Sequence, residues 1–419
     1  MRRILASSFL GSAIEFYDFL LYASASALVF AQVFFASLDP GIATIASFGT
    51  LAAGYVARPL GGIVFGHFGD KLGRKGVLVT TMLMMGVATA LIGLLPTYDQ
   101  IGVAAPLILI ALRVIQGFAV GGEWGGAMLI ALEHAPGGKR GFAASFANLG
   151  APAGSILSAG VLGLFSLMPK EQFLAWGWRV PFLLSVVLVL IGMIVRLKVV
   201  ESPLFRSFDR EAEQRRVPLL DVLAKSPKVL ILGALVAMSQ LTISGMASVW
   251  GLSRATAQGV DPTFALNAKV ASAVALFLLT VVSARLSDRF GRRPVIAVGI
   301  IAAILFAYPL LLLVDSGDNW SFLIAVIVGQ GIQGVILGPL AAFLAELFPT
   351  AVRFTGSSLA FQGASAIGAG FTPIIASSLA SSSGGLPLLS GVWIAALILC
   401  AIALFIIPES NKRDLTTIR

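Results

Sequence analysis

Two carboxylates lie three positions apart in a stretch of sequence that is otherwise apolar. They are Glu15 and Asp18, within "GSAIEFYDFLLYA" at residues 11–23. Residues with this spacing share a face of a helix, and two neighbouring carboxylates in a low dielectric cannot both ionise easily. Such a pair can take up a proton on one side of a membrane and release it on the other. We expect Asp18, flanked by Tyr17 and Phe19, to carry the proton and Glu15 to modulate it, although the spacing alone does not decide between the two.

A guanidinium, that of Arg113, is the third group that could take part in this chemistry. Arg113 lies in the long apolar run 104–133, at a depth similar to that of Asp18 if both segments cross a membrane. An arginine can bind a carboxylate through two parallel hydrogen bonds. We therefore expect an anionic substrate and a proton to bind together, because protonation of Asp18 would free Arg113 for the substrate. The alternative is a buried structural ion pair that joins the two helices.

Three more ionisable residues interrupt apolar runs, and each is a functional candidate because charges inside a bilayer are costly. Arg58 and Glu123 have opposite charges and similar expected depths, which predicts a gating or structural ion pair rather than a substrate contact. Lys269 lies in the outer half of another apolar run. It could meet an anionic substrate from the C-terminal half, or extend its ammonium to the membrane surface, and the sequence favours neither.

Several neutral polar and aromatic side chains also fall inside the apolar runs. Buried amides need hydrogen-bond partners, which a cavity can supply through water or substrate, but amides also join helices to one another in membranes. The candidates for lining a substrate cavity are Tyr22, Gln116, Trp124, Asn148, Gln240, Trp250, Gln333 and Gln362.

The composition indicates the solvent in which these residues act. The chain has 419 residues, of which 58% are hydrophobic and only 12% charged, whereas a soluble domain is about 25% charged. The single cysteine excludes a disulfide framework or a cysteine metal site, and the sequence has no nucleotide-binding loop or hydrolase motif. We expect a membrane protein that is not an enzyme, with the proton as coupling ion and no metal or other cofactor.

The apolar runs are long enough for twelve transmembrane helices, since about 20 residues cross the hydrocarbon core. Most of the 29 Lys and Arg lie in alternate loops, which by the positive-inside rule predicts cytoplasmic termini. The net charge of +9 is therefore a topology signal and does not indicate nucleic acid. The expected spans are 8–36, 44–66, 76–95, 104–133, 141–168, 177–198, 228–254, 262–284, 294–314, 320–345, 354–381 and 386–408.

Two motifs occur twice along the chain. "GHFGDKLGRK" at 66–75 recurs as "ARLSDRFGRR" at 284–293, and "EHAPGGKRGFAAS" at 133–145 is matched more weakly at 346–358. Each copy is expected to form a tight turn at the membrane edge, and its charges are interpreted as cytoplasmic latches or, alternatively, as turns that only fix topology. The aligned charges are Asp70, Arg74, Glu133, Arg140, Asp288, Arg292, Glu346 and Arg353.

The repeats divide the chain into two halves. We expect an N-terminal six-helix bundle at 1–200, a polar cytoplasmic linker at 201–227 and a C-terminal six-helix bundle at 228–419. In transporters built from duplicated halves the substrate site lies near the membrane midplane, between the halves. The carboxylates of the first span would then face a central cavity rather than lipid.

Several fragments resemble a known family over the whole length of the chain. They are "IEFYDFLLYA" in the first span, "ARPLGGIVFGHFGDKLGRK" at 57–75, "RVIQGFAVGGEWGGA" at 113–127, "WGWRVPFLLS" at 176–185, "ESPLF" at 201–205 and "ELFPTAVRFTGSS" at 346–358. With them the chain resembles the metabolite:proton symporter family of the major facilitator superfamily, shikimate transporters most closely. The resemblance implies an all-α fold of two pseudo-symmetric six-helix bundles that works by alternating access.

The resemblance also implies a function and a place in the cell. We expect proton-coupled uptake of a small carboxylate-bearing metabolite such as shikimate, across a bacterial inner membrane and by a monomer. The alternatives are uptake of a zwitterionic osmolyte such as proline or betaine, and an uncoupled facilitator of the same fold. The expected partners are the substrate and the lipid bilayer, without nucleic acid.

Overall fold

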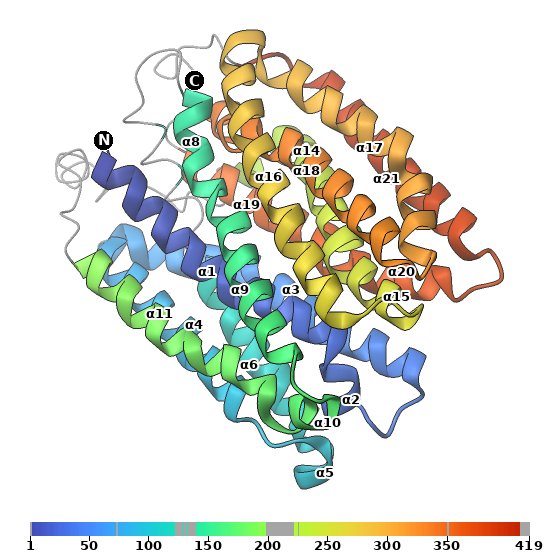
Figure 1. Ribbon diagram of the computed structural model, residues 1–419. Coiled ribbons are helices and arrows are strands. Elements are labelled where there is room, and N and C mark those ends of the chain that lie inside the picture. The colour runs from blue at the N-terminus through green and yellow to red at the C-terminus, as the bar shows by residue number, and fades with distance from the viewer. Residues whose placement is uncertain are drawn as a thin grey trace.

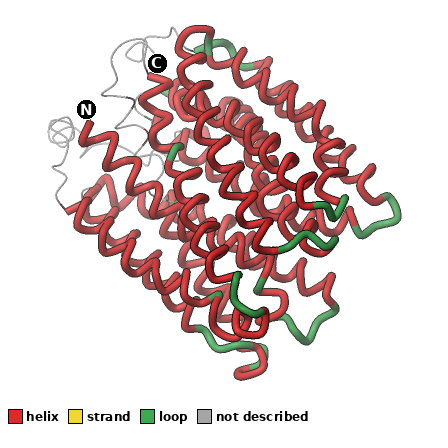
Figure 2. Tube along the Cα trace, viewed as in Figure 1, coloured by secondary structure: helices red, strands yellow, loops and turns green. Residues whose placement is uncertain are grey.

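A computed structural model describes residues 2–72, 74–121, 128, 132, 140–197, 222–224, 226–349 and 352–410. It does not describe the side chains of residues 2–8, 66–72, 74–75, 78 and 195–197. Every regular element in the described ranges is a helix, and the helices run along a common direction as one bundle (Figure 1). Within the described ranges, the connections between them are short (Figure 2). The predicted all-α fold class is confirmed.

The N-terminal half passes up and down through the bundle, with breaks inside some passes. One break lies at Val29 and another at Leu149. The elements of this half are α1 (Arg2–Leu28), α2 (Phe30–Phe34), α3 (Pro40–Leu72), α4 (Arg74–Leu94), α5 (Tyr98–Ile101), α6 (Ala104–Val120), α8 (Arg140–Asn148), α9 (Gly150–Ser166), α10 (Lys170–Gln172), the π-helical η1 (Phe173–Gly177) and α11 (Arg179–Leu197).

The C-terminal half repeats this arrangement with longer continuous helices. Two of its passes contain a π-helical segment in place of a break, and such segments often occur at functional sites. The elements are α14 (Pro227–Ser244), η3 (Gly245–Trp250), α15 (Gly251–Ala257), α16 (Pro262–Phe290), α17 (Arg292–Asp315), α18 (Asn319–Leu347), α19 (Arg353–Ser365), η4 (Ala366–Phe371), α20 (Thr372–Ala380) and α21 (Gly385–Ile406).

Most of these passes are long and apolar enough to cross a bilayer. Within the described residues, eight helices meet that requirement, or nine if the bent pair Lys170–Gly177 and Arg179–Ile194 forms one span. Two shorter apolar helices, Val79–Leu94 and Ala104–Val120, lie in two more of the predicted spans. Each of the twelve predicted spans contains a helix of the structure.

The predicted turn in the second copy of the motif is confined to one residue. α16 continues through Asp288 to Phe290 and α17 begins at Arg292, so Gly291 alone connects them. Its φ of 105° lies in the left-handed region, where a side chain would be strained. This sharp turn holds Asp288 close to the first turn of α17.

Glycines allow α3 and α6 to approach each other closely. A Cβ atom on Gly117 would overlap the backbone of Gly54, and one on Gly61 would overlap the backbone of Phe118. Small residues of this kind let membrane helices pack backbone to backbone. The close approach fixes the relative positions of the arginines that these two helices carry, Arg58 and Arg113.

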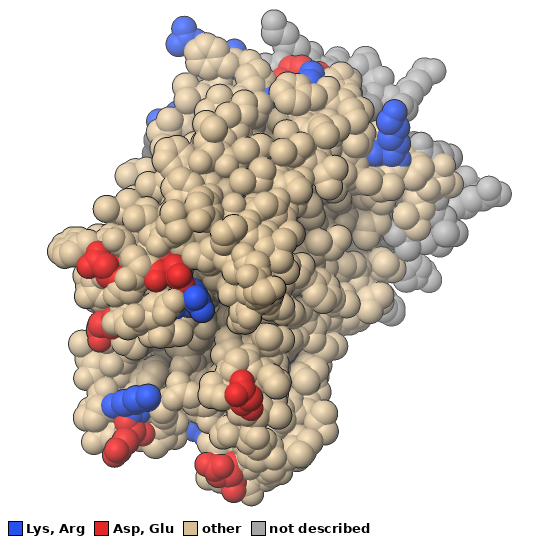
Figure 3. Space-filling model, turned by 90° about the vertical axis from the view of Figure 1, so that its right-hand side faces the viewer, with Lys and Arg blue, Asp and Glu red and all other residues tan. Residues whose placement is uncertain are grey.

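The outer surface of the bundle is suited to lipid. Large apolar side chains such as Leu164, Leu305 and Phe405 are exposed, and a contiguous apolar exterior marks a surface covered by another apolar phase. On the face in Figure 3, Lys, Arg, Asp and Glu gather toward the two ends, and the belt between them consists of other residues.

The two ends of the bundle differ in which parts of the chain they contain. α1 begins and α21 ends at the same end (Figure 1), which we call the terminal end. The opposite end, the distal end, contains α5 and the connections from α15 to α16 and from α17 to α18.

Candidate functional site

Asp18 lies inside the N-terminal bundle. Its side chain is 1% exposed, and neither carboxylate oxygen has a hydrogen-bond partner. The hydroxyls of Thr89 on α4 and Ser185 on α11 lie beside it, and Arg113 is the cation that faces it. An ionised carboxylate without partners is costly in such a place, so the position suits a group that gains and loses a proton.

Glu15 has a different surrounding from Asp18, although both lie on α1. It is 6% exposed and faces Arg58 of α3. Arg58 was predicted to pair with Glu123, which lies outside the part of the chain that the structure describes. Glu15 is therefore an acidic neighbour of Arg58 that the sequence reasoning did not name.

Two guanidinium groups, those of Arg58 and Arg113, stack on the ring of Phe19. Their Cζ atoms lie 3.7 and 3.6 Å from the ring centroid. They occupy opposite faces of the ring, because two groups at that height on one face would overlap. Arg58 also stacks on Tyr55 at 4.5 Å, and Arg113 on Tyr22 at 4.0 Å. Aromatic faces attract cations, the more so away from water, so the rings hold both arginines in place.

Arg113 is connected to Asp18 through two intermediate side chains. Its Nη1 donates to Gln116 Oε1 at 3.1 Å, and Gln116 Nε2 donates to Thr89 Oγ1 at 2.7 Å. Thr89 in turn lies beside Asp18. The side chain of Arg113 is fully buried, yet its Nε and Nη2 have no partner. Such orphaned donors are costly, and an incoming carboxylate would satisfy them.

A small cavity lies between the two halves. Its volume is about 60 Å³, room for about two water molecules. Arg58 and Phe19 reach this cavity, whereas Arg113 lies behind the Phe19 ring and does not line it. The residues around it are Phe16, Phe19, Leu20, Tyr55, Arg58, Asn148, Ala151, Ser155, Gln240, Leu241, Ser244, Ser248, Leu276, Gln330, Gln333, Leu337, Phe361 and Ala369.

Side-chain amides of the C-terminal half line the cavity opposite Arg58. Gln333 Nε2 donates to Gln240 Oε1 at 2.9 Å, and Gln330 Nε2 donates to Ser248 Oγ at 2.6 Å. Gln333 Oε1 has no partner. The amide nitrogen of Gln362 is likewise buried without a partner, but Gln362 does not line the cavity, so Gln333 Oε1 is the acceptor that this half offers to a ligand there.

Three other predicted cavity residues are buried inside the protein. Tyr22 is fully buried and donates from its hydroxyl to Thr50 Oγ1 at 2.6 Å. Asn148 Nδ2 donates to the carbonyl of Leu337 at 2.9 Å, which joins the two halves beside the cavity. Trp250 is 2% exposed in η3.

At the terminal end, the second copy of the motif closes the gap between the halves. Asp288 accepts hydrogen bonds from the backbone N–H groups of Gly141 and Phe142 at 2.8 and 3.0 Å. These groups lie in the first turn of α8, where a carboxylate is favoured by unpaired N–H groups and by the helix dipole. Arg292 pairs with Asp288 at 2.7 Å and with Glu346 at 3.3 Å.

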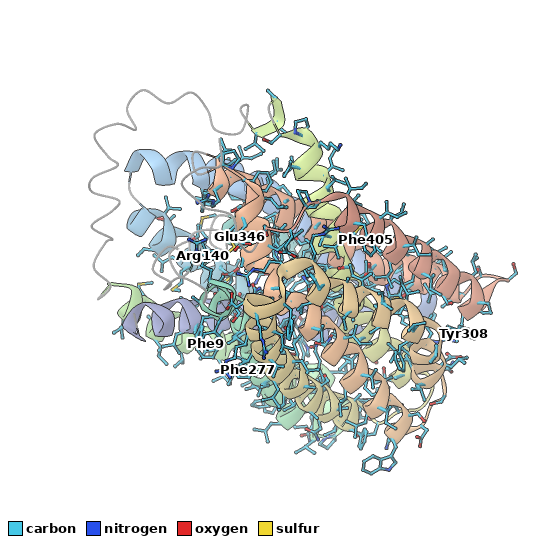
Figure 4. All side chains as sticks on the ribbon, turned by 90° about the horizontal axis from the view of Figure 1, so that it is seen from above. Phe9, Arg140, Phe277, Tyr308, Glu346 and Phe405 are labelled. Carbon is cyan, nitrogen blue, oxygen red and sulfur yellow. The ribbon has the colours of Figure 1, made fainter. Side chains whose placement is uncertain are left out.

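The segment after α21 is tied into the same network. Glu409 accepts from the backbone N–H groups of Arg292 and Arg293, each at 2.9 Å, and Ser410 donates to Glu346 at 2.7 Å. Figure 4, seen from above, shows Glu346 and Arg140 among the helices. Arg353 donates from Nε to the carbonyl of Phe348 at 3.2 Å.

The distal end is closed by contacts of another kind. Ser166 Oγ and Thr263 Oγ1 lie 2.9 Å apart, at the facing ends of α9 and α16. Nearer the cavity, Lys269 Nζ donates to Ser24 Oγ at 2.7 Å. Lys269 is 3% exposed, so its ammonium does not extend to the surface in this conformation. Among the described residues, contacts between the halves therefore lie at both ends of the bundle, on either side of the small cavity.

Some predicted site residues lie outside the described part of the chain. These are Glu123, Trp124, Glu133 and the side chains of Asp70 and Arg74. Among the described residues, no group of three His, Cys, Asp or Glu could hold a metal ion.

Three residues of the site and of the terminal network are not predicted from the sequence. Phe19 was treated only as a neighbour of Asp18, although an aromatic residue next to buried arginines is a common stacking partner. Thr89 gave no signal, because a threonine in an apolar helix usually bonds to its own backbone. Glu409 could have been noticed, since it is an acid directly after the last span and close to the basic loops.

Comparison with known proteins identifies the whole chain as transporter-like. The family profile described as sugar (and other) transporter matches it twice, at residues 4–217 and 206–419. The two matches agree with two related halves.

The alignments with three named relatives cover most of this chain and most of each relative. The inner membrane metabolite transport protein YhjE of Escherichia coli K12 is 40% identical over 99% of this chain and 95% of its own. The shikimate transporter of that organism is 38% identical over 92% of this chain and 89% of its own. Its proline/betaine transporter is 34% identical over 92% and 79%.

Among solved structures, the chain is similar to the xylose transporter XylE from E. coli in a partially occluded inward-open conformation. The TM-score is 0.78 over 99% of both chains, at 19% sequence identity. Likeness at this identity shows a shared fold.

Proposed function

Because the chain belongs to the sugar and other transporter family of the major facilitator superfamily, we propose that it carries a small carboxylate-bearing metabolite across the membrane together with a proton. The observation that carries this proposal is the pair of buried arginines around Phe19. Arg58 Nε and Arg113 Nε and Nη2 lack hydrogen-bond partners, and a carboxylate is the ligand that fits such donors.

Within the cavity, the substrate carboxylate meets Arg58, which lines it. Its access to Arg113 requires the ring of Phe19 to move, because the ring lies between the two guanidiniums. The amide of Gln333, which lines the cavity, then binds hydroxyl or other polar groups on the remainder of the substrate. A hydroxylated acid such as shikimate matches this arrangement.

Proton coupling acts through Asp18 and the side chains that connect it to Arg113. While Asp18 is ionised it attracts Arg113 from within the bundle and competes with the substrate for this charge. When Asp18 is protonated, the attraction is lost and Arg113 is free to bind the carboxylate. Thr89 and Gln116 transmit the change, since they join the two groups by hydrogen bonds and close contact.

The distribution of charge supports an orientation with the terminal end in the cytoplasm. Arg285, Arg289, Arg292 and Arg293 lie together at the terminal end, around the turn from α16 to α17. Positive residues favour the cytoplasmic side. The named relative of the inner membrane supports the same location for this multi-pass chain. We propose in addition that the protein works as a monomer.

Uptake into proteoliposomes tests the proposal. The purified protein is given labelled shikimate, malate, proline or glycine betaine, with and without an inside-alkaline pH gradient. We expect a carboxylic acid to accumulate about tenfold per pH unit for one coupled proton, since a pH unit corresponds to about 1.36 kcal/mol. A protonophore should abolish the accumulation, and Asp18→Asn should retain exchange but lose the response to the gradient.

The alternatives give different results in the same assay. Uptake that ignores the gradient would identify an uncoupled facilitator. Accumulation of proline or glycine betaine without any of the acids would identify an osmolyte carrier, for which Phe16 and Phe361 of the cavity could supply aromatic contacts to a quaternary ammonium.

A further inference from the structure

Lys269 is a buried cation that belongs to neither the proposed proton site nor the proposed substrate site. Its side chain is 3% exposed. An ammonium has three N–H donors, yet its single hydrogen bond goes to the neutral hydroxyl of Ser24. No carboxylate among the described residues forms an ion pair with it. A buried charge without a counterion is costly, so this position needs an anion or an opening to water.

The position of Lys269 is distal to the cavity and between the two halves. It lies two helical turns from Leu276, which lines the cavity, and about 10 Å from the distal start of α16 at 1.5 Å per residue. Its bond to Ser24 joins α16 of one half to α1 of the other. Separation of the halves at the distal end would break this bond and expose the ammonium.

The three buried cations of this region contact α1 at successive positions along its length. From the terminal end, Arg58 stacks on Phe19, Arg113 stacks on Phe19 and Tyr22, and Lys269 binds Ser24. The cations therefore succeed one another along the helix that lines the path from the distal end to the cavity.

The other described cations of the distal end either bond to neighbouring groups or are exposed to water. Arg254 pairs with Asp315 at 2.6 Å. Arg179 donates to the carbonyls of Gly93 and Leu95. Lys170 is exposed in α10, where water screens its charge. Among the described residues, Lys269 is thus a buried cation without a counterion that lies inward of these groups.

We infer that Lys269 is a separate anion-binding site in the distal half of the pathway, closed by Ser24 in this conformation, which receives a carboxylate before Arg58 and Arg113 do. The inference rests on the proposed function in that the pathway carries a carboxylate. In the open state the ammonium draws anions into a narrow, low-dielectric path, where a fixed charge acts more strongly than in bulk water. In the closed state it returns to Ser24.

Charge-selective thiol labelling tests the site without a known substrate. A Ser24→Cys variant on a Cys400→Ala background is reacted from outside with sulfonatoethyl or trimethylammonioethyl methanethiosulfonate, which are similar in size and opposite in charge. We expect the anionic reagent to react faster, and the ratio of the two rates to fall about tenfold when Lys269→Met is added, as expected for one unit charge about 6 Å away.

Two further variants make the result specific. Lys269→Arg should keep the preference for the anionic reagent, because it keeps the charge. Lys170→Met, which removes an exposed lysine of the same end, should leave the ratio unchanged. A ratio that Lys269→Met does not alter, or a complete lack of labelling from outside, would overturn the inference. The proposed function has its own test in the response to a pH gradient, so either can fail while the other stands.

Discussion

At the scale of single residues, the two carboxylates of α1 face different surroundings. Glu15 faces Arg58, whereas Asp18 turns into the N-terminal bundle toward Thr89 and Ser185. The sequence placed both on one helical face, which is correct for residues three apart, but a shared face does not mean a shared neighbour. Asp18 thus reaches Arg113 only through space and through the chain of Thr89 and Gln116.

Removal of the Thr89 hydroxyl should weaken the coupling between proton and substrate. Thr89→Val keeps the shape of the side chain but leaves Gln116 Nε2 without its acceptor. We expect the accumulation of substrate driven by one pH unit to fall by about fivefold or more, which corresponds to the lower end of measured coupling free energies. Exchange of substrate should continue. Accumulation and exchange in proteoliposomes measure the two quantities.

Thr80→Val is the matched control for this prediction. Thr80 lies on the same helix, is exposed and donates only to the backbone of Gly76. If Thr89→Val and Thr80→Val accumulate substrate equally well, the chain of hydrogen bonds does not transmit the effect of the proton.

At the scale of elements, the geometry of the site depends on how closely α3 and α6 pack. Gly54 lies directly beneath the Arg113 side chain, so that a Cβ atom there would collide with it. Gly117 rests on the backbone of Gly54 in turn. The two arginines reach opposite faces of Phe19 because this contact sets the distance between their helices.

Gly117→Ala should force α3 and α6 apart and destabilise the protein. The added methyl group would overlap the carbonyl of Gly54, and overpacking typically costs about 1–3 kcal/mol. Thermal unfolding in detergent should show the loss. Gly49→Ala on α3, where nothing lies within 4 Å of the new Cβ, should not lower the melting temperature. Equal melting temperatures for both variants would contradict this account of the packing.

At the scale of the whole molecule, the two ends are closed by chemically different contacts. Asp288 closes the terminal end by accepting two backbone N–H bonds from α8 of the other half. The distal end relies on hydroxyls and on Lys269. Hydrogen bonds to an ionised carboxylate are the stronger kind, so opening at the terminal end requires Asp288 to separate from the backbone N–H groups of α8.

Asp288→Asn should favour opening at the terminal end. An amide oxygen carries less charge than a carboxylate and cannot pair with Arg292 as an ion. A Ser155→Cys thiol in the cavity, on a Cys400→Ala background, should then react about fivefold or more faster with an impermeant reagent applied from the terminal side. Asp315→Asn, which breaks a pair at the distal end, serves as the control. An unchanged rate from the terminal side would show that Asp288 does not hold this end closed.

The sequence by itself determined the membrane class, the positions of the twelve spans, the duplication and the short inventory of buried charges. These are properties of composition and of local runs, since hydropathy and repeats can be read along the chain. The same holds for the motif around Asp288, whose charges are close in sequence to the helix ends that they bind.

Only the tertiary structure decided which of these charges meet. The stacking of Arg58 and Arg113 on Phe19 depends on the rotation and spacing of three helices. The bond between Lys269 and Ser24 joins residues 245 positions apart. Such contacts follow from how each helix turns about its own axis within the bundle, and a hydropathy pattern that is apolar on nearly every face does not specify that rotation.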